Sequence, residues 1–289
     1  MSPRVQLWLA VFVTVASIAG LGAFIVETIL THPGHGYAVR LQLPAAGRKI
    51  GLPKIEGPQD ASRPLVVIDA GHGGHDPGAS GAGYEEKVLT LGLAQALRDR
   101  LLAGGGIRVA MTRDTDQFLA LAERRKIARI LGAGLFISIH ADSAGEKSGI
   151  TGATIYTLSA KASDETAARL AARENRADRV NGVALEGQSD AVSAILVDLS
   201  QRRVREESAE LAQLIIREGV GQMDFHTTPR RSAAFAVLKS ADVPSVLFEA
   251  GYITNPEDAR RLASNSGRER FAEVVDRAVR AYFARQTGV

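Results

Sequence analysis

Three short runs of apolar residues constrain the fold of this chain more than any other feature. Residues 65–68, 135–139 and 246–248 are almost entirely apolar, without the alternation of polar and apolar positions that a half-exposed strand shows. Continuous runs of this length are typical of strands that are covered on both faces, as in a parallel sheet. We therefore expect three buried strands, each followed by a polar residue: Asp69, His140 and Glu249.

Segments with helical spacing alternate with these strands. Residues 86–102 carry apolar side chains mostly three and four positions apart, and the glycines at 104–106 then end the predicted helix. We expect further strands at 107–112, 153–158 and 235–238, and further helices at 119–131, 166–179, 204–216 and 271–283. Alternating strands and helices imply an α/β sheet with crossover connections.

The first thirty residues predict export. Arg4 precedes an apolar run, residues 7–26, which is interrupted only by small polar residues. About 20 apolar residues can span a bilayer, whereas the core of a cleaved signal peptide usually has about 7–15. We expect residues 1–30 to be a signal peptide or an anchor in contact with the inner membrane, and residues 31–63 to be a linker.

Composition narrows the chemistry. The chain has no cysteine, so any metal must be held by histidines and carboxylates. Its formal charge of +3 comes without a dense block of lysine and arginine, so we expect no nucleic-acid partner. The sequence also lacks the Gly-x-Ser-x-Gly turn of serine hydrolases and the Gly-Lys-Ser/Thr ending of a phosphate loop. With these classes of site set aside, a metal-dependent activity that uses histidines and carboxylates is still compatible with the sequence.

Ionisable residues follow three of the predicted strands. His72 comes after the first strand, His140 after the third and Glu249 after the last. Ligands of open α/β sheets bind beyond the carboxyl ends of the strands, so these side chains are expected to share one crevice. Two histidines and one carboxylate are a common zinc set, and Glu86 or its neighbour Glu85 can supply the carboxylate. A further, unliganded carboxylate must then move protons, which suits Glu249.

Each of these residues has a structural alternative. A single histidine at a strand end is more often structural than a ligand, although two such histidines on separate strands favour the metal site. Glu86 alone would also suit the first turn of a helix, where the dipole favours a carboxylate. His75 and His226 lie in polar segments and are more simply explained as surface residues than as a further ligand or substrate contacts.

Several motifs in a fixed order resemble one known family. Residues 65–283 are similar to the zinc-dependent N-acetylmuramoyl-L-alanine amidases that separate daughter cells (amidase type 3). The matching segments are Ile68-Asp69-Ala70-Gly71-His72-Gly73-Gly74, Asp76-Pro77-Gly78-Ala79, Glu86-Lys87, Thr112-Arg113, Ser138-Ile139-His140-Ala141-Asp142, Tyr156-Thr157-Leu158-Ser159, the stretch 243–252 and Asn255-Pro256.

The resemblance implies an activity and a set of residues. The implied fold is a mixed, mainly parallel sheet flanked by helices, with the catalytic domain at residues 64–285. His72, Glu86 and His140 match the ligands of one zinc ion, and Glu249 matches the catalytic glutamate. Glu86 fits the family register and Glu85 does not. The implied substrate is the peptidoglycan amide between N-acetylmuramic acid and L-alanine, cleaved in the periplasm during wall remodelling and cell separation.

The resemblance also implies regulation through residues 160–218. Such amidases carry an inserted helix whose glutamate blocks the zinc until an activator protein displaces it, and here Glu174 or Glu186 would take that role. The alternative is a solvated helix packed beside the sheet. For the whole chain, the alternatives are another zinc peptidoglycan hydrolase, such as a carboxypeptidase, and a non-catalytic wall-binding homologue.

Overall fold

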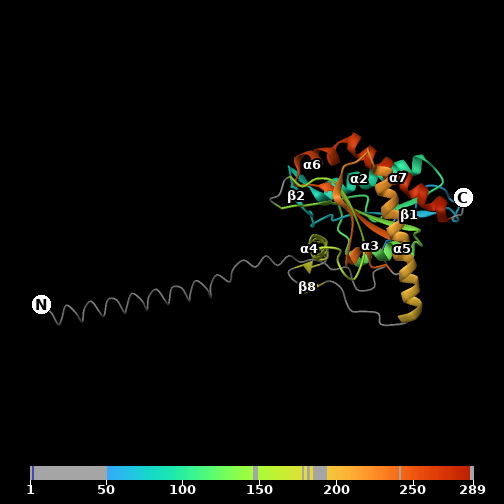
Figure 1. Cartoon of the computed structure of the whole chain (residues 1–289), viewed down its shortest axis with the longest axis horizontal. Coiled ribbons are helices and arrows are strands. Elements are labelled where there is room, and N and C mark those ends of the chain that lie inside the picture. Colours follow the sequence, from blue (N-terminus) through green and yellow to red (C-terminus); the bar gives the residue numbers. More distant parts are fainter. Residues whose placement is uncertain are drawn as a thin grey trace. The chain divides into compact units, whose positions relative to one another are not determined.

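The computed structural model describes residue 2 and residues 51–145, 149–177, 179–180, 183–184, 194–240 and 242–286 (Figure 1). Residues 50–289 form one compact unit. Within the described ranges, no helix is both long and apolar enough to cross a membrane. The predicted signal or anchor at residues 7–26 lies outside these ranges, as does Glu186.

A six-stranded sheet forms the centre of residues 50–289. Its strand order is β4-β1-β5-β10-β6-β9, and every neighbouring pair is parallel except β10 and β6. The strands are β1 (Leu65–Ala70), β4 (Arg108–Met111), β5 (Leu135–Asp142), β6 (Ala153–Leu158), β9 (Phe225–Ala233) and β10 (Ser245–Tyr252). Two short hairpins join β2 (Ser80–Gly81) to β3 (Tyr84–Glu85) and β7 (Arg179–Val180) to β8 (Val183–Ala184). The mixed, mainly parallel sheet expected from the sequence is confirmed.

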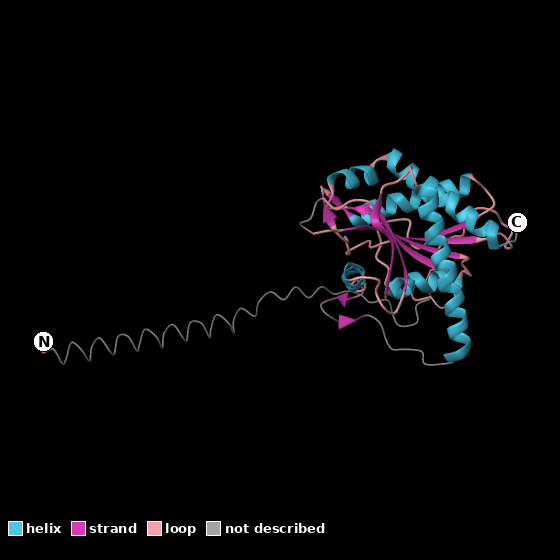
Figure 2. Ribbon diagram, viewed as in Figure 1, coloured by secondary structure: helices cyan, strands magenta, loops and turns pink. Residues whose placement is uncertain are grey.

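Helices cover both faces of this sheet (Figure 2). One face packs against α2 (Glu86–Ala103), α5 (Ala194–Gly219), α6 (Pro256–Ala263) and α7 (Asn265–Gln286). The other packs against α3 (Leu121–Ile130), α4 (Glu165–Glu174) and the short 3-10 helix η1 (Ala236–Leu238). Alternate residues of β1 enter the two cores, since Val66 and Ile68 join the first and Leu65 and Val67 the second. Burial on both faces explains why this strand has no polar alternation.

Two predictions from the sequence differ from the structure. The strand predicted at 235–238 is wrong, because this segment is the helix η1, whose residues Val237 and Leu238 fill the second core. The strand at this edge is instead β9, which is largely polar and contains Pro229, a residue confined mostly to edge strands. The helix predicted at 166–179 ends at Glu174 and is followed by the β7–β8 hairpin.

Candidate metal centre

Three adjacent parallel strands bring the predicted site residues to one edge of the sheet. Strands β1, β5 and β10 lie next to one another, and Glu249 on β10 pairs directly with His140 on β5. His72 follows β1 by two residues. The three side chains are buried, with exposed fractions of 8% for His72, 4% for His140 and 1% for Glu249.

The loop that carries His72 is shaped by glycine. His72 itself has a φ of 59°, which is rare for a residue with a side chain and marks a constrained position. A Cβ at Gly71 would lie 2.5 Å from the His140 ring, and a Cβ at Gly78 would lie 2.6 Å from the His72 ring and 2.7 Å from a Glu86 oxygen. Only glycine therefore lets the two imidazoles and the carboxylate approach one another this closely.

Asp76 orients the His72 ring. Its Oδ2 lies 2.8 Å from His72 Nδ1, and Gly78 N donates to its Oδ1 at 3.1 Å. A carboxylate that accepts the Nδ1 proton leaves Nε2 with its lone pair directed into the site. Asp76 belongs to one of the motifs that resemble the family, but nothing in the sequence indicates this orienting role.

Glu86 lies between the two imidazoles. Its Oε1 is 3.1 Å from His72 Nε2 and 3.1 Å from His140 Nδ1, and its Oε2 accepts a hydrogen bond from Ala79 N at 2.8 Å. The side chain is 1% exposed, because Glu86 opens α2 directly beneath the His72 loop. Glu85 points away, with a side chain that is 52% exposed beside Lys87. The structure thus places Glu86, and not Glu85, in the centre.

Glu174, the last residue of α4, completes the group. Its Oε2 lies 3.3 Å from His72 Nε2 and 3.4 Å from His140 Nδ1. Arg173 Nε donates to the other oxygen at 3.1 Å, and its Nη2 donates to Asp142 at 2.9 Å. The end of α4 is therefore held over the two histidines by one carboxylate and the arginine that orients it.

The donor set fits a divalent metal ion. His72, His140 and Glu174 offer ligand atoms that all lie within 4.8 Å of one another, and all three residues are buried. Tetrahedral zinc with bonds of about 2.0–2.1 Å holds neighbouring donors about 3.3–3.4 Å apart, close to the spacings of this group. Although burial would raise it, the pKa of Glu86 lies well below its usual value because of His72 and His140. Buried carboxylates and two imidazoles that meet at one point are a donor set suited to a cation.

Glu249 stands apart from this hydrogen-bonded group. Both of its carboxylate oxygens are buried and have no hydrogen-bond partner among the described residues. Burial raises the pKa of Glu249 well above its usual value, and the nearby charges of Asp142, Glu86 and Glu174 raise it further. A buried carboxyl with a high pKa and no partner is suited to taking up and releasing a proton.

A buried ion pair between Arg124 and Asp69 stabilises the backbone of the loop that carries His72. Arg124 is 2% exposed and donates to Asp69 at 2.9 Å and to the carbonyl oxygens of Ala70 at 2.6 Å and His72 at 2.7 Å. Arg113 donates to the carbonyl oxygen of Gly71, which lies between Ala70 and His72, at 2.8 Å. Both guanidinium groups fix the backbone on which His72 stands. Neither role is visible in the sequence, because each bond joins residues more than 40 positions apart.

Comparison with known proteins identifies the family. The Amidase_3 family model, described as N-acetylmuramoyl-L-alanine amidase, matches residues 66–281. The chain belongs to this family. The N-acetylmuramoyl-L-alanine amidase AmiA of Escherichia coli K12 is 37% identical to this amidase over 235 residues, or 81% of each chain.

Further relatives agree with this assignment. AmiC of Neisseria meningitidis is 35% identical over 78% of this amidase, which spans 54% of that relative. The structure of the amidase AmiC2 of Nostoc punctiforme aligns with a TM-score of 0.53 at 28% identity, covering 77% of this chain and 98% of that one. The sheet and the helices around the centre therefore belong to a shared amidase fold.

The other histidines considered for the site lie outside the centre of this amidase. His75 is exposed and packs against Phe118, with ring centroids 4.2 Å apart. His226 is half-buried on β9, where its Nδ1 accepts a hydrogen bond from Thr228 N at 3.1 Å. Neither belongs to the group of candidate ligands found among the described residues.

Proposed function

We propose that this amidase hydrolyses the peptidoglycan amide between N-acetylmuramic acid and L-alanine, with zinc held by His72, Glu86 and His140. The convergence of Glu86 and the two imidazoles, with Oε1 3.1 Å from a nitrogen of each ring, is the observation that supports this most directly. The family match over residues 66–281 supplies the substrate class.

We propose Glu249 as the general base and acid. A bound zinc ion supplies Lewis acidity toward the scissile carbonyl and the attacking water. Glu249 would accept the proton of that water and pass it to the leaving amine nitrogen. Two observations support this assignment: its oxygens are unpartnered, and its backbone is paired with that of His140 in the neighbouring strand.

We further propose that the structure represents an inhibited form. Glu174 Oε2 stands at 3.3 and 3.4 Å from the two histidines, where the open position of a catalytic zinc would lie. Ala167, Leu170 and Ala171 of α4 are buried in the second core, so the helix is packed and not merely solvated. An activator protein that displaces α4 would open the position. Glu186 lies outside the described residues, and Glu174 is the residue that the contacts support.

We expect the protein to act in the periplasm. Residues 1–30 carry the predicted export signal or inner-membrane anchor, and the curated relatives are N-acetylmuramoyl-L-alanine amidases, whose substrate lies outside the cytoplasm. We propose a function in wall remodelling and the separation of daughter cells.

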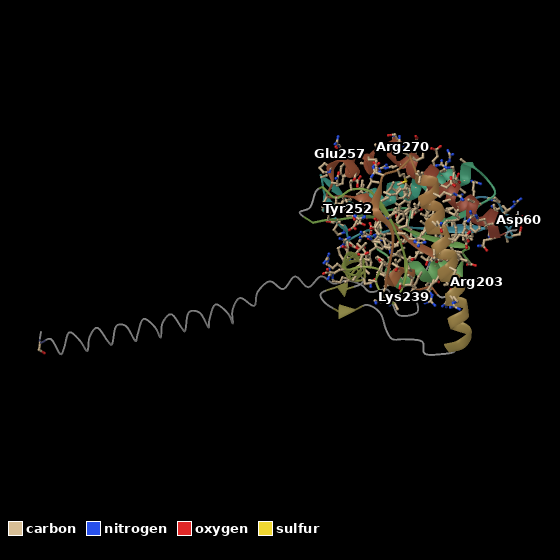
Figure 3. The ribbon with its side chains drawn as sticks, in the orientation of Figure 1. Asp60, Arg203, Lys239, Tyr252, Glu257 and Arg270 are labelled. Carbon is tan, nitrogen blue, oxygen red and sulfur yellow. The ribbon has the colours of Figure 1, made fainter. Side chains whose placement is uncertain are left out.

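Digestion of purified sacculi by Glu249→Gln tests the assignment. We expect the variant to bind zinc but to release no soluble material, because the amide side chain cannot accept the proton. Glu257→Gln is the matched control, since Glu257 is exposed on α6 (Figure 3) and its charge lies outside the centre. Mass analysis should show whole stem peptides released by wild type, whereas a carboxypeptidase would release only terminal residues. Full activity of Glu249→Gln would exclude it from the mechanism.

A further inference from the structure

A basic cleft adjoins the metal centre. It has a volume of about 620 Å³ and lies among α4, β9 and the carboxyl ends of β5 and β10, where it includes Tyr252 (Figure 3). Its charged lining consists of four arginines and one aspartate, namely Arg169, Arg173, Arg176, Arg231 and Asp142. The excess of guanidinium groups makes this cleft a place for an anionic ligand.

Arg231 is the arginine with unused donors. Its side chain is 8% exposed, yet its Nε and Nη1 have no hydrogen-bond partner among the described residues. The nearest carboxylate oxygen, on Asp164, is 3.6 Å from Nε, and Nη2 lies 3.3 Å from His226 Nδ1. A buried guanidinium with unsatisfied donors is costly unless a ligand completes its hydrogen bonds.

The other cationic groups of the cleft differ from Arg231. Arg173 is bonded to Asp142 and Glu174, and Arg169 donates to Glu165 at 2.6 Å. Burial and the charge of Arg231 lower the pKa of His226, so its ring adds no positive charge near neutral pH. The charge available to a ligand is therefore mainly that of Arg231 and of the exposed Arg176.

A row of unpaired polar groups leads from Arg231 to Glu249. The hydroxyl groups of Thr154 and Tyr156 on β6 are buried without a hydrogen-bond partner among the described residues. Tyr156 pairs with Arg231 on β9, and Thr154 pairs with Glu249 on β10. Paired residues on adjacent strands and residues two apart in a strand share a face, so the four side chains lie on one side of the sheet.

The chemistry of the substrate indicates which of its two sides, the muramic acid or the stem peptide, would bind to the cleft and the row of hydroxyls. In the intact amide, the lactyl carboxyl of the muramic acid is consumed in the scissile bond, so that side of the substrate carries no carboxylate. The stem peptide carries free carboxylates along with backbone amides. The unpaired guanidinium of Arg231, which lines the cleft, and the separate row of buried, unpaired hydroxyls that ends at Glu249 match the peptide side.

We propose that Arg231 binds a free carboxylate of the stem peptide, with Thr154 and Tyr156 as polar contacts to the peptide between Arg231 and the scissile bond. This inference rests on the proposed amidase function and assigns the peptide side of the substrate to the face of the sheet that α4 covers. The peptide would bind there once α4, with Arg169 and Arg173, is displaced, whereas Arg231 stays on β9. Arg231 is thus a specificity-determining residue that acts on binding and not on the chemical step.

The test compares two soluble substrates, a muramoyl tripeptide with free stem carboxylates and the same compound with those groups as carboxamides. We expect wild type to prefer the acidic substrate. Arg231→Gln should raise KM for that substrate at least about tenfold and leave kcat unchanged, because the variant loses one hydrogen bond to a charged group. KM for the amidated substrate should stay the same, and Arg231→Lys should retain part of the preference.

Arg203→Gln is the control, because it removes one exposed positive charge on α5 that does not line the cleft (Figure 3). Equal changes of KM for both substrates in Arg231→Gln, or no preference in wild type, would overturn the proposal. If neither wild type nor Glu174→Gln, which removes the proposed block of the metal centre, cleaves either substrate, the amidase function itself fails. In that case, calorimetry measures the affinity of the free acidic tripeptide for wild type and for Arg231→Gln. Equal affinities would show that Arg231 does not bind a stem carboxylate.

Discussion

Replacing Glu174 with glutamine tests whether the end of α4 closes the metal centre. The change keeps the size of the side chain but removes the negative charge that lies 3.3 Å from His72 Nε2 and 3.4 Å from His140 Nδ1. It also weakens the contact with Arg173, which lies 3.1 Å from the other carboxylate oxygen. The N-terminal cap of α4, where Asp164 accepts from Ala167 N, is untouched, so the helix should stay folded.

The expected effect follows from the value of one charged contact. A hydrogen bond to a charged group contributes about 1.5–3 kcal/mol. Loss of that amount from the closed form would increase the ratio of open to closed molecules by about 10- to 150-fold, because each 1.4 kcal/mol is a factor of about ten. As long as the closed form still dominates, the basal hydrolysis rate should rise by the same factor.

Release of dye from labelled sacculi, without any added activator, measures that rate. Zinc content must be determined in parallel, since Glu174→Gln also removes a donor from the centre. Glu165→Gln is the matched control, because Glu165 lies on the same helix with a side chain that is 83% exposed. A basal rate of Glu174→Gln at or below that of wild type, with zinc still bound and the fold intact, would refute the inhibitory role.

Two further predictions concern stability. Arg124→Met should lower the free energy of unfolding in urea by about 3–5 kcal/mol, because it leaves the buried Asp69 charge without its cation; a loss below about 1 kcal/mol would contradict the supporting role. Glu249→Gln should stabilise the zinc-free protein at neutral pH, because the raised pKa of Glu249 means that folding costs free energy once the unfolded carboxyl ionises. In thermal unfolding, this gain should vanish as the pH falls below the unfolded value of about 4.3, and a pH-independent gain would contradict the reasoning.

The strands that carry the site were predictable because burial leaves a simple signal. Strands β1, β5 and β10 are buried along their whole length, and burial on both faces requires unbroken apolar runs. Strand β9 escaped prediction because it is an edge strand whose exposed positions are polar. Conversely, the run at 235–238 is too short for its periodicity to distinguish a strand from a helical turn.

The centre itself was only partly predictable. His72, His140 and Glu249 could be named because parallel strands deliver their carboxyl ends to one edge of the sheet. Glu174 was named only through the family resemblance, because nothing in the pattern of α4 indicates which residue reaches another element. Arg231 was missed altogether: it lies in the unpredicted strand β9, and its unused donors become apparent only in the folded chain.

The position of α4 bears on proton transfer as well as on access. The pKa of Glu249 is raised most by burial and then, in decreasing order, by the charges of Asp142, Glu86 and Glu174. The charge of Arg173 lowers it, but by less than any of these raises it. Displacement of α4 would remove Glu174 and Arg173 together and admit water, so that the pKa of Glu249 would fall on balance. A general base must be ionised to accept a proton from water. One movement of the helix would therefore open the metal centre and favour the ionised form of Glu249, which is the form that acts as a base.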